Sequence, residues 1–79
     1  MKDYEWNEDF GSQKANVRAW LLDGRSITTL EALNRFGSLR LSAIVFRLRE
    51  EGLPIEMERL QVSPKKRVAR YFIKKENLN

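Results

Sequence analysis

Apolar residues recur at helical spacing on either side of one glycine in the middle of the chain. In the segment before it, Thr28 and Glu31 have the spacing of a helix-capping box. Gly37 can adopt the left-handed backbone that ends a helix. The apolar stripe between them consists of Leu30, Leu33 and Phe36. This pattern predicts a helix that starts at Thr28 and stops at Gly37.

A second periodic segment, Ser38–Glu51, follows that glycine directly. On a helical wheel of about 100° per residue, its aliphatic residues gather on one side. This inner side consists of Leu41, Ile44, Val45 and Leu48. The outer side consists mostly of Leu39, Arg40, Ala43, Phe46 and Arg47. Two short helices joined by a glycine-bearing turn form a helix-turn-helix unit, whose second helix fits the major groove of DNA.

The flanking segments predict the further elements that such a pair of helices needs to complete a core. Ser12 can cap a helix that runs to about Leu22. The inner side of this helix would carry Val17, Trp20 and Leu21. Asp23-Gly24 makes a turn, and the extended residues 25–27 make a very short strand.

After Gly52 the hydrophobic period changes from helical to alternating. Ile55–Glu58 alternates apolar and acidic residues, as a half-buried strand does. The alternation later slips by one residue, which predicts a bulge near Glu58–Arg59. Ser63–Lys66 makes a turn, and Arg67–Ile73 returns as a β-branched and aromatic strand. The sequence thus predicts an α+β domain in the order helix, short strand, helix, helix and β-hairpin.

Charge divides the chain into three parts. Residues 1–11 hold four acids and three aromatic residues beside one lysine, and we expect a flexible or loosely docked leader. The rest of the chain has 14 basic against 7 acidic residues; within it, residues 12–73 form the domain and 74–79 a polar tail. A basic domain indicates a polyanionic partner, with nucleic acid ahead of an anionic membrane surface. Ordinary solubilising charge is the alternative.

The residue types of the chain argue against catalysis. There is no histidine and no cysteine, which removes the commonest general base, the commonest metal ligands and any disulfide. We therefore expect no enzyme, no cofactor, no metal and no small-molecule substrate. No apolar run exceeds four residues, so we also expect no membrane span and a cytoplasmic protein.

Several short motifs carry a resemblance to a known family. They are W-L-L-x-G-x-S-I-T, E-A-L-x-x-F-G, R-L-S and R-V-A-R-Y, in that order. Their order and spacing resemble a small winged helix-turn-helix family common in phage and prophage genomes. The resemblance runs from Val17 to about Phe72, and it implies that fold, DNA binding and a role as a small regulator. The family has an aliphatic residue after the turn glycine, where this chain has Ser38, so we expect Leu39 to turn inward instead.

The start of the Ser38–Glu51 helix is the first expected DNA contact. Arg40 can donate to both major-groove acceptors of guanine, and no acid lies three or four residues from it. Ser38 and Ser42 are short side chains near the helix start, which suits contacts to phosphate or base. Arg47 is placed for a backbone phosphate or for an intrahelical ion pair with a glutamate of the same helix.

The hairpin tip, Ser63–Arg67, is the second expected contact, on flanking backbone or in the minor groove. Its cations are Lys65, Lys66 and Arg67. A solvated turn is the alternative for this cluster. Arg25, just before the short strand, could touch a flanking phosphate, whereas Arg35 is most simply the i+4 partner of Glu31.

Phe46 does not fit a polar outer side. It could contact a thymine methyl, pack under the acidic leader or form a protein interface. The other large apolar residues are most simply core: Trp20, Leu33, Leu41, Leu48, Tyr71 and Phe72. Two hypotheses follow. One is a module that binds double-stranded DNA as a phage-type transcription regulator; the other is a winged-helix interaction module that docks a protein or a second copy through Phe46 or the leader.

Overall fold

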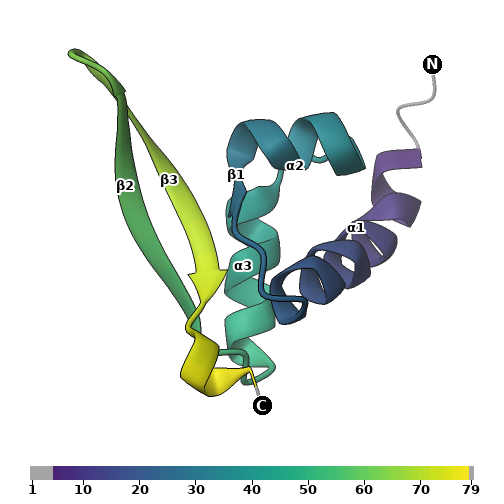
Figure 1. Ribbon diagram of the computed structural model, residues 1–79. Helices are drawn as coiled ribbons and strands as arrows, with labels where there is room; N and C mark the ends of the chain where they lie inside the picture. Colours follow the sequence, from purple (N-terminus) through teal and green to yellow (C-terminus); the bar gives the residue numbers. More distant parts are fainter. Residues whose placement is uncertain (1–4, 79) are drawn as a thin grey trace.

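Three helices and a three-stranded antiparallel sheet make up the fold, which confirms the predicted α+β class and the order of its elements (Figure 1). The computed structural model describes the backbone of residues 5–78 and the side chains of residues 11–78. The elements are α1 (Glu5–Leu22), β1 (Ile27–Thr28), α2 (Thr29–Phe36), α3 (Leu41–Glu50), β2 (Ile55–Ser63), β3 (Lys66–Ile73) and the short 3-10 helix η1 (Lys75–Asn77).

Helix α1 is longer than the sequence indicated. It starts at Glu5, so the predicted cap at Ser12 is wrong and residues 5–11 are helical. The remainder of the expected leader, residues 1–4, lies outside the described residues. At its other end α1 closes at a turn in which Gly24 has φ 87° and Arg25 N–H donates to Trp20 O at 3.3 Å. This turn keeps Arg25 out of the strand, which is why β1 begins two residues later than predicted.

The α2 start and the turn after it confirm the predictions from local sequence. Glu31 N–H donates to Thr28 Oγ1 at 3.2 Å, and Thr28 N–H donates to Glu31 Oε1 at 2.9 Å, which completes the capping box. Gly37 ends the helix with φ 66°, and its N–H reaches Leu33 O at 2.9 Å.

The buried side of α2 differs from the predicted stripe. Ala32 is fully buried and Phe36 packs against the core, whereas Leu30 is 64% exposed and Leu33 lies at the surface. A helix of two turns with four apolar residues can present more than one side to the core. The elements packed against α2 select the side that carries Ala32 and Phe36.

The sheet has the order β1-β3-β2, and its hairpin extends away from the helices (Figure 1). Ser63 pairs with Lys66, which confirms the predicted turn. The register shift lies between Gln61 and Ser63, so the bulge predicted near Glu58–Arg59 is wrong. Beyond Ile55 no residue of β2 is fully buried, and Met57, predicted to face inward, is exposed. The bulge lies where the hairpin is least constrained by packing.

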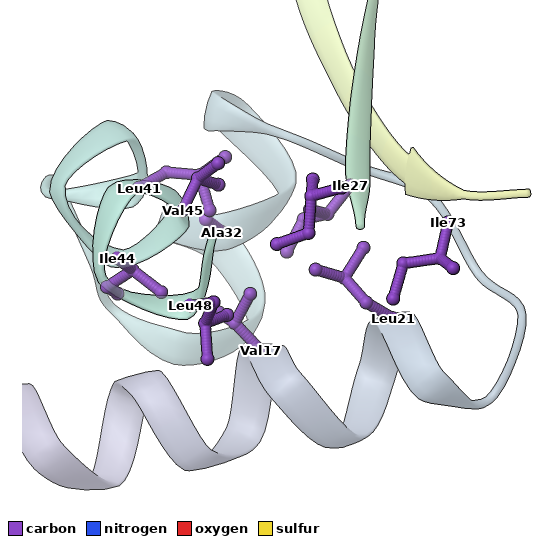
Figure 2. Close-up of a cluster of buried hydrophobic side chains, with 10 residues drawn as sticks. Val17, Leu21, Ile27, Ala32, Leu41, Ile44, Val45, Leu48 and Ile73 are labelled. Atoms are coloured by element: carbon purple, nitrogen blue, oxygen red, sulfur yellow. The ribbon is translucent and has the colours of Figure 1, made fainter. Parts of the chain in front are cut away.

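The core lies where α1, α3 and the base of the sheet meet (Figure 2). Its buried side chains are Val17, Leu21, Ile27, Ala32, Leu41, Ile44, Val45, Leu48, Ile55 and Ile73. All four residues of the predicted inner side of α3 are among them. Half-buried Trp20, Phe36, Leu53, Tyr71 and Leu78 pack around this cluster. Leu78 shows that the end of the chain, predicted to be a polar tail, contributes an apolar side chain to the core edge.

Candidate nucleic-acid interface

The outer side of α3 is exposed as the helical wheel predicted. Ala43, Phe46 and Arg47 are all at the surface, while the opposite side of the same helix is at most 1% exposed. The apolar side is held against α1 and the sheet, because burying four aliphatic side chains outweighs any other orientation of so short a helix. The outer side is therefore fixed in direction by the core beneath it.

Ser38 does not belong to this exposed surface. Its side chain is fully buried, and its Oγ accepts a hydrogen bond from Arg40 N–H at 3.1 Å. The expected role of Ser38 in contacting DNA is thus wrong, and so is the expectation that Leu39 turns inward, since Leu39 is 61% exposed. The hydroxyl takes the inward place because it satisfies a backbone donor that the first turn of a helix leaves unpaired.

Arg40 and Ser42 lie at the start of α3. The helix begins at Leu41 with Arg40 at its cap position, three residues after the predicted Ser38 start, and Ile44 N–H makes the first helical bond to Arg40 O at 3.0 Å. Both side chains are exposed, and the first turn holds no acid. Unpaired N–H groups and the helix dipole make such an end attractive to phosphate.

Arg47 forms one of the two contacts expected for it, the intrahelical ion pair. Its Nη1 lies 3.5 Å from Glu50 Oε1, three residues along the helix. Both side chains are more than half exposed, and a surface pair of this kind contributes at most about 1 kcal/mol. A phosphate could therefore replace Glu50 at little cost, so the phosphate contact stays a prediction.

The hairpin tip carries the second predicted cluster. Lys65, Lys66 and Arg67 are exposed at the end of the hairpin that is farthest from the helices (Figure 1). Among the ion pairs of the described residues, none involves these three cations. Gln61 Nε2 donates to Pro64 O at 3.3 Å across the turn. The tip therefore presents three positive charges that no acid of the described chain neutralises by direct contact.

Arg25 lies apart from both clusters and is engaged within the protein. Its Nε donates to Asp23 Oδ2 at 2.9 Å, and its guanidinium lies 4.7 Å from the centre of the Trp20 ring. Arg35 also stacks on Trp20, at 4.8 Å, instead of pairing with Glu31, whose carboxylate is taken by the capping box. The phosphate contact proposed for Arg25 gains no support from this placement.

Two arginines that the sequence did not single out make contacts to the hairpin. Arg49 donates through Nε and Nη2 to Ile55 O, at 3.1 and 3.0 Å, and so fixes the end of α3 to the start of β2. Arg70 pairs with Glu58 directly across the hairpin. Neither contact could be read from spacing, because the first needs the turn between the elements and the second needs the strand register.

A groove separates the hairpin from α2. Its volume is about 540 Å³, and it is lined by Thr28, Thr29, Leu30, Leu60, Val62, Lys66, Arg67, Val68 and Ala69. The lining is mostly aliphatic, and its only charged groups are the two basic residues of β3. Leu30 is exposed because it faces this groove and not the core. Nothing in the sequence pattern indicated this groove.

The structure has a helix-turn-helix whose second helix exposes one side, and a β-hairpin follows it directly. This arrangement is characteristic of one family. The model of the winged helix-turn-helix domain matches residues 12–76. The chain belongs to the winged helix-turn-helix family. Comparisons with curated proteins and with solved structures found no significant match.

Membership of this family gives the hairpin and helix α3 their usual names. The β2–β3 hairpin is the wing, and α3 is the second helix of the helix-turn-helix. Winged helix-turn-helix domains typically bind DNA and are not a catalytic family. Within residues 5–78 no helix is long and apolar enough to span a bilayer.

Proposed function

We propose that this winged helix-turn-helix domain binds double-stranded DNA, with α3 in the major groove and the wing tip on flanking backbone or in the minor groove. The observation that carries the proposal is the wing tip. Three adjacent cations, Lys65, Lys66 and Arg67, project from the molecule without an ion-pair partner among the described residues. Such a cluster is well suited to a phosphate backbone.

The exposed side of helix α3 supports the same proposal independently of the wing tip. Arg40 and Ser42 are exposed at its start, where the dipole favours an anion, and the outer side continues through Ala43 and Phe46. The helix contains 10 residues and so is about 15 Å long. An α-helix with its side chains is about 10–12 Å across, which fits a groove about 12 Å wide. Small side chains near its start let the helix approach base edges closely.

The biological context that we propose is a small regulator of the phage or prophage type. This part rests on the resemblance of the sequence motifs and on the basic charge of the domain. It is tested by recovering the DNA that the protein binds in its own cells. Fragments that lie beside transcription starts support regulation, and fragments scattered without relation to transcription starts contradict it.

DNA binding is tested by fluorescence polarisation with a labelled mixed-sequence duplex at about 50 and about 200 mM salt. Each phosphate contact that is formed contributes about −0.9 to the slope of log K against log salt. We expect Lys65→Ala and Lys66→Ala each to reduce the slope by about one unit and to weaken binding to all sequences alike. A protein that binds no duplex at low salt contradicts the proposal.

Lys75→Ala is the matched control for these variants. It removes the same charge from an exposed lysine in η1, beyond the end of β3 that is opposite the wing tip. We expect its salt slope to match that of the unmodified protein. An equal loss of slope in all three variants would mean that net charge, and not contact at the wing tip, determines binding.

The groove between α2 and the wing favours a second function, that of a protein-interaction module. Its aliphatic lining, with Leu30 and Val62 each more than half exposed, is the kind of surface that a partner covers. Leu30→Ser would weaken such docking without placing a charge beside Lys66 and Arg67, the wing-tip cations that line the same groove. Absence of duplex binding by the unmodified protein at low salt, together with loss of a co-purifying partner from this variant, would favour the second function over the first.

A further inference from the structure

The exposed side of α3 carries one large apolar side chain, that of Phe46. Phe46 is 58% exposed and is the sixth residue of the helix. The residue three positions before it is Ala43 and the residue four positions before it is Ser42; both are small and exposed, and on a helix they share its side. The residues three and four positions after it are Arg49 and Glu50, which are engaged with Ile55 O and with Arg47. The ring therefore lies exposed within the surface that we propose enters the major groove.

The cations of this surface lie around the ring. Arg40 is at the helix start, and Arg47, the residue after Phe46, pairs with Glu50 at 3.5 Å. Side chains that face the groove from the first part of a recognition helix, Arg40 among them, meet base edges, while a cation beside that surface, such as Arg47, is placed for phosphate. The group at Phe46 is a benzyl side chain, which can neither donate nor accept a conventional hydrogen bond.

One base offers such a group an apolar partner in the major groove. Thymine alone among the four bases has a methyl group there, at C5. Guanine and cytosine present only hydrogen-bonding groups at their edges, and an aromatic ring that covered them would exclude water without replacing its hydrogen bonds. The ring would thus favour thymine by contact and disfavour G·C pairs by desolvation.

We infer that Phe46 is a specificity-determining residue, which reads a thymine C5-methyl group opposite the middle of α3. The inference rests on the proposed DNA binding and adds its sequence preference: an A·T pair at the centre of the major-groove contact. Ala43 and Ser42 leave room for the methyl group to reach the ring. Arg40 is still expected to contact a guanine, at the start of the helix.

The test removes the methyl group and nothing else. A high-affinity duplex is first selected from a random pool with the unmodified protein, and each thymine is then replaced in turn by uracil. We expect one or two positions at which uracil weakens binding about fourfold, the ratio that corresponds to about 0.8 kcal/mol for one buried carbon group. Elsewhere uracil should have no effect.

Variants connect that effect to the ring. With Phe46→Ala the same positions should lose their sensitivity, so that thymine and uracil duplexes bind alike, while Phe46→Leu should keep part of the discrimination. Leu22→Ala is the control, because it removes an exposed aliphatic side chain at the far end of α1. It should leave the ratio of uracil to thymine affinity unchanged.

The possible results separate the inference from the function on which it rests. If no duplex binds at low salt, the proposed function itself fails. If a duplex binds but uracil is tolerated at every position, the inference is overturned and DNA binding stands. If uracil sensitivity persists in Phe46→Ala, another residue reads the methyl group. If Phe46→Ala instead changes the sedimentation of the free protein and uracil has no effect, Phe46 forms a protein interface and the inference falls.

Discussion

The clearest single test of how α3 is positioned is the change Ser38→Ala. Ser38 is the only buried residue between Gly37 and the helix, and its Oγ accepts the Arg40 N–H at 3.1 Å. That N–H belongs to the start of α3, where backbone donors have no partner within the helix. An alanine at this position keeps the packing of the β-carbon and removes only the acceptor.

The size of the effect follows from this geometry. Loss of one intramolecular hydrogen bond of this kind typically costs about 1 kcal/mol, with a range of about 0.5–1.5. For a chain of this length each kcal/mol lowers Tm by about 4–8 °C. We therefore expect Ser38→Ala to unfold about 4–8 °C below the unmodified protein, measured by circular dichroism at a heating rate for which unfolding is reversible.

Ser42→Ala is the matched control, four residues later in the first turn of α3. Its side chain is exposed, so removing the hydroxyl should change the free energy of unfolding by less than about 0.5 kcal/mol. At temperatures well below Tm, Ser38→Ala should bind DNA as the unmodified protein does. An unchanged Tm combined with weaker DNA binding by Ser38→Ala would refute the reasoning, because the hydroxyl would then have to lie at the surface.

Three further predictions concern the core, the α2 start and base reading. Leu48→Ala, at a fully buried position, should lower the free energy of unfolding, measured in urea, by about 2–5 kcal/mol. Leu30→Ala, at an exposed position, should change it by less than about 0.5 kcal/mol, and similar losses in the two variants would contradict the assigned core. Thr28→Ala breaks the capping box and should cost about 1 kcal/mol in the same titration, and no loss would mean that the box does not stabilise α2. Arg40→Ala should cost about 1–3 kcal/mol in binding and relax the selected DNA sequence at one position; an unchanged preference would exclude guanine reading.

Local sequence determined the parts of the fold that depend on a few neighbouring residues. The capping box of Thr28 and Glu31, the left-handed Gly37 and the turn at Pro64 are each completed by groups within four residues of one another. Such features form wherever those residues stand, because their hydrogen bonds and backbone angles are local. The inner side of α3 was also readable, since its four aliphatic residues leave only one orientation that buries them.

The candidate site was predictable in part for the same reason. The exposure of Arg40, Ser42, Arg47 and the wing-tip cations follows from the helical period and from a polar turn. What those residues contact was not predictable. Arg25 stacks on Trp20, five residues earlier, because the turn at Gly24 folds it back, and that contact has no signature in the pattern of polar and apolar residues.

Tertiary packing decided the positions where the sequence allowed two solutions. Either Ser38 or Leu39 could face inward after Gly37, and the structure buries the serine because its hydroxyl satisfies a helix-start donor there. Leu30 could have joined Ala32 in the core, and it lines the groove beside the wing instead. The hydrogen bond of Ser38 is local, but the burial of its side chain, like the exposure of Leu30, depends on which distant elements pack beside it, and only the folded arrangement of helices and wing fixes that.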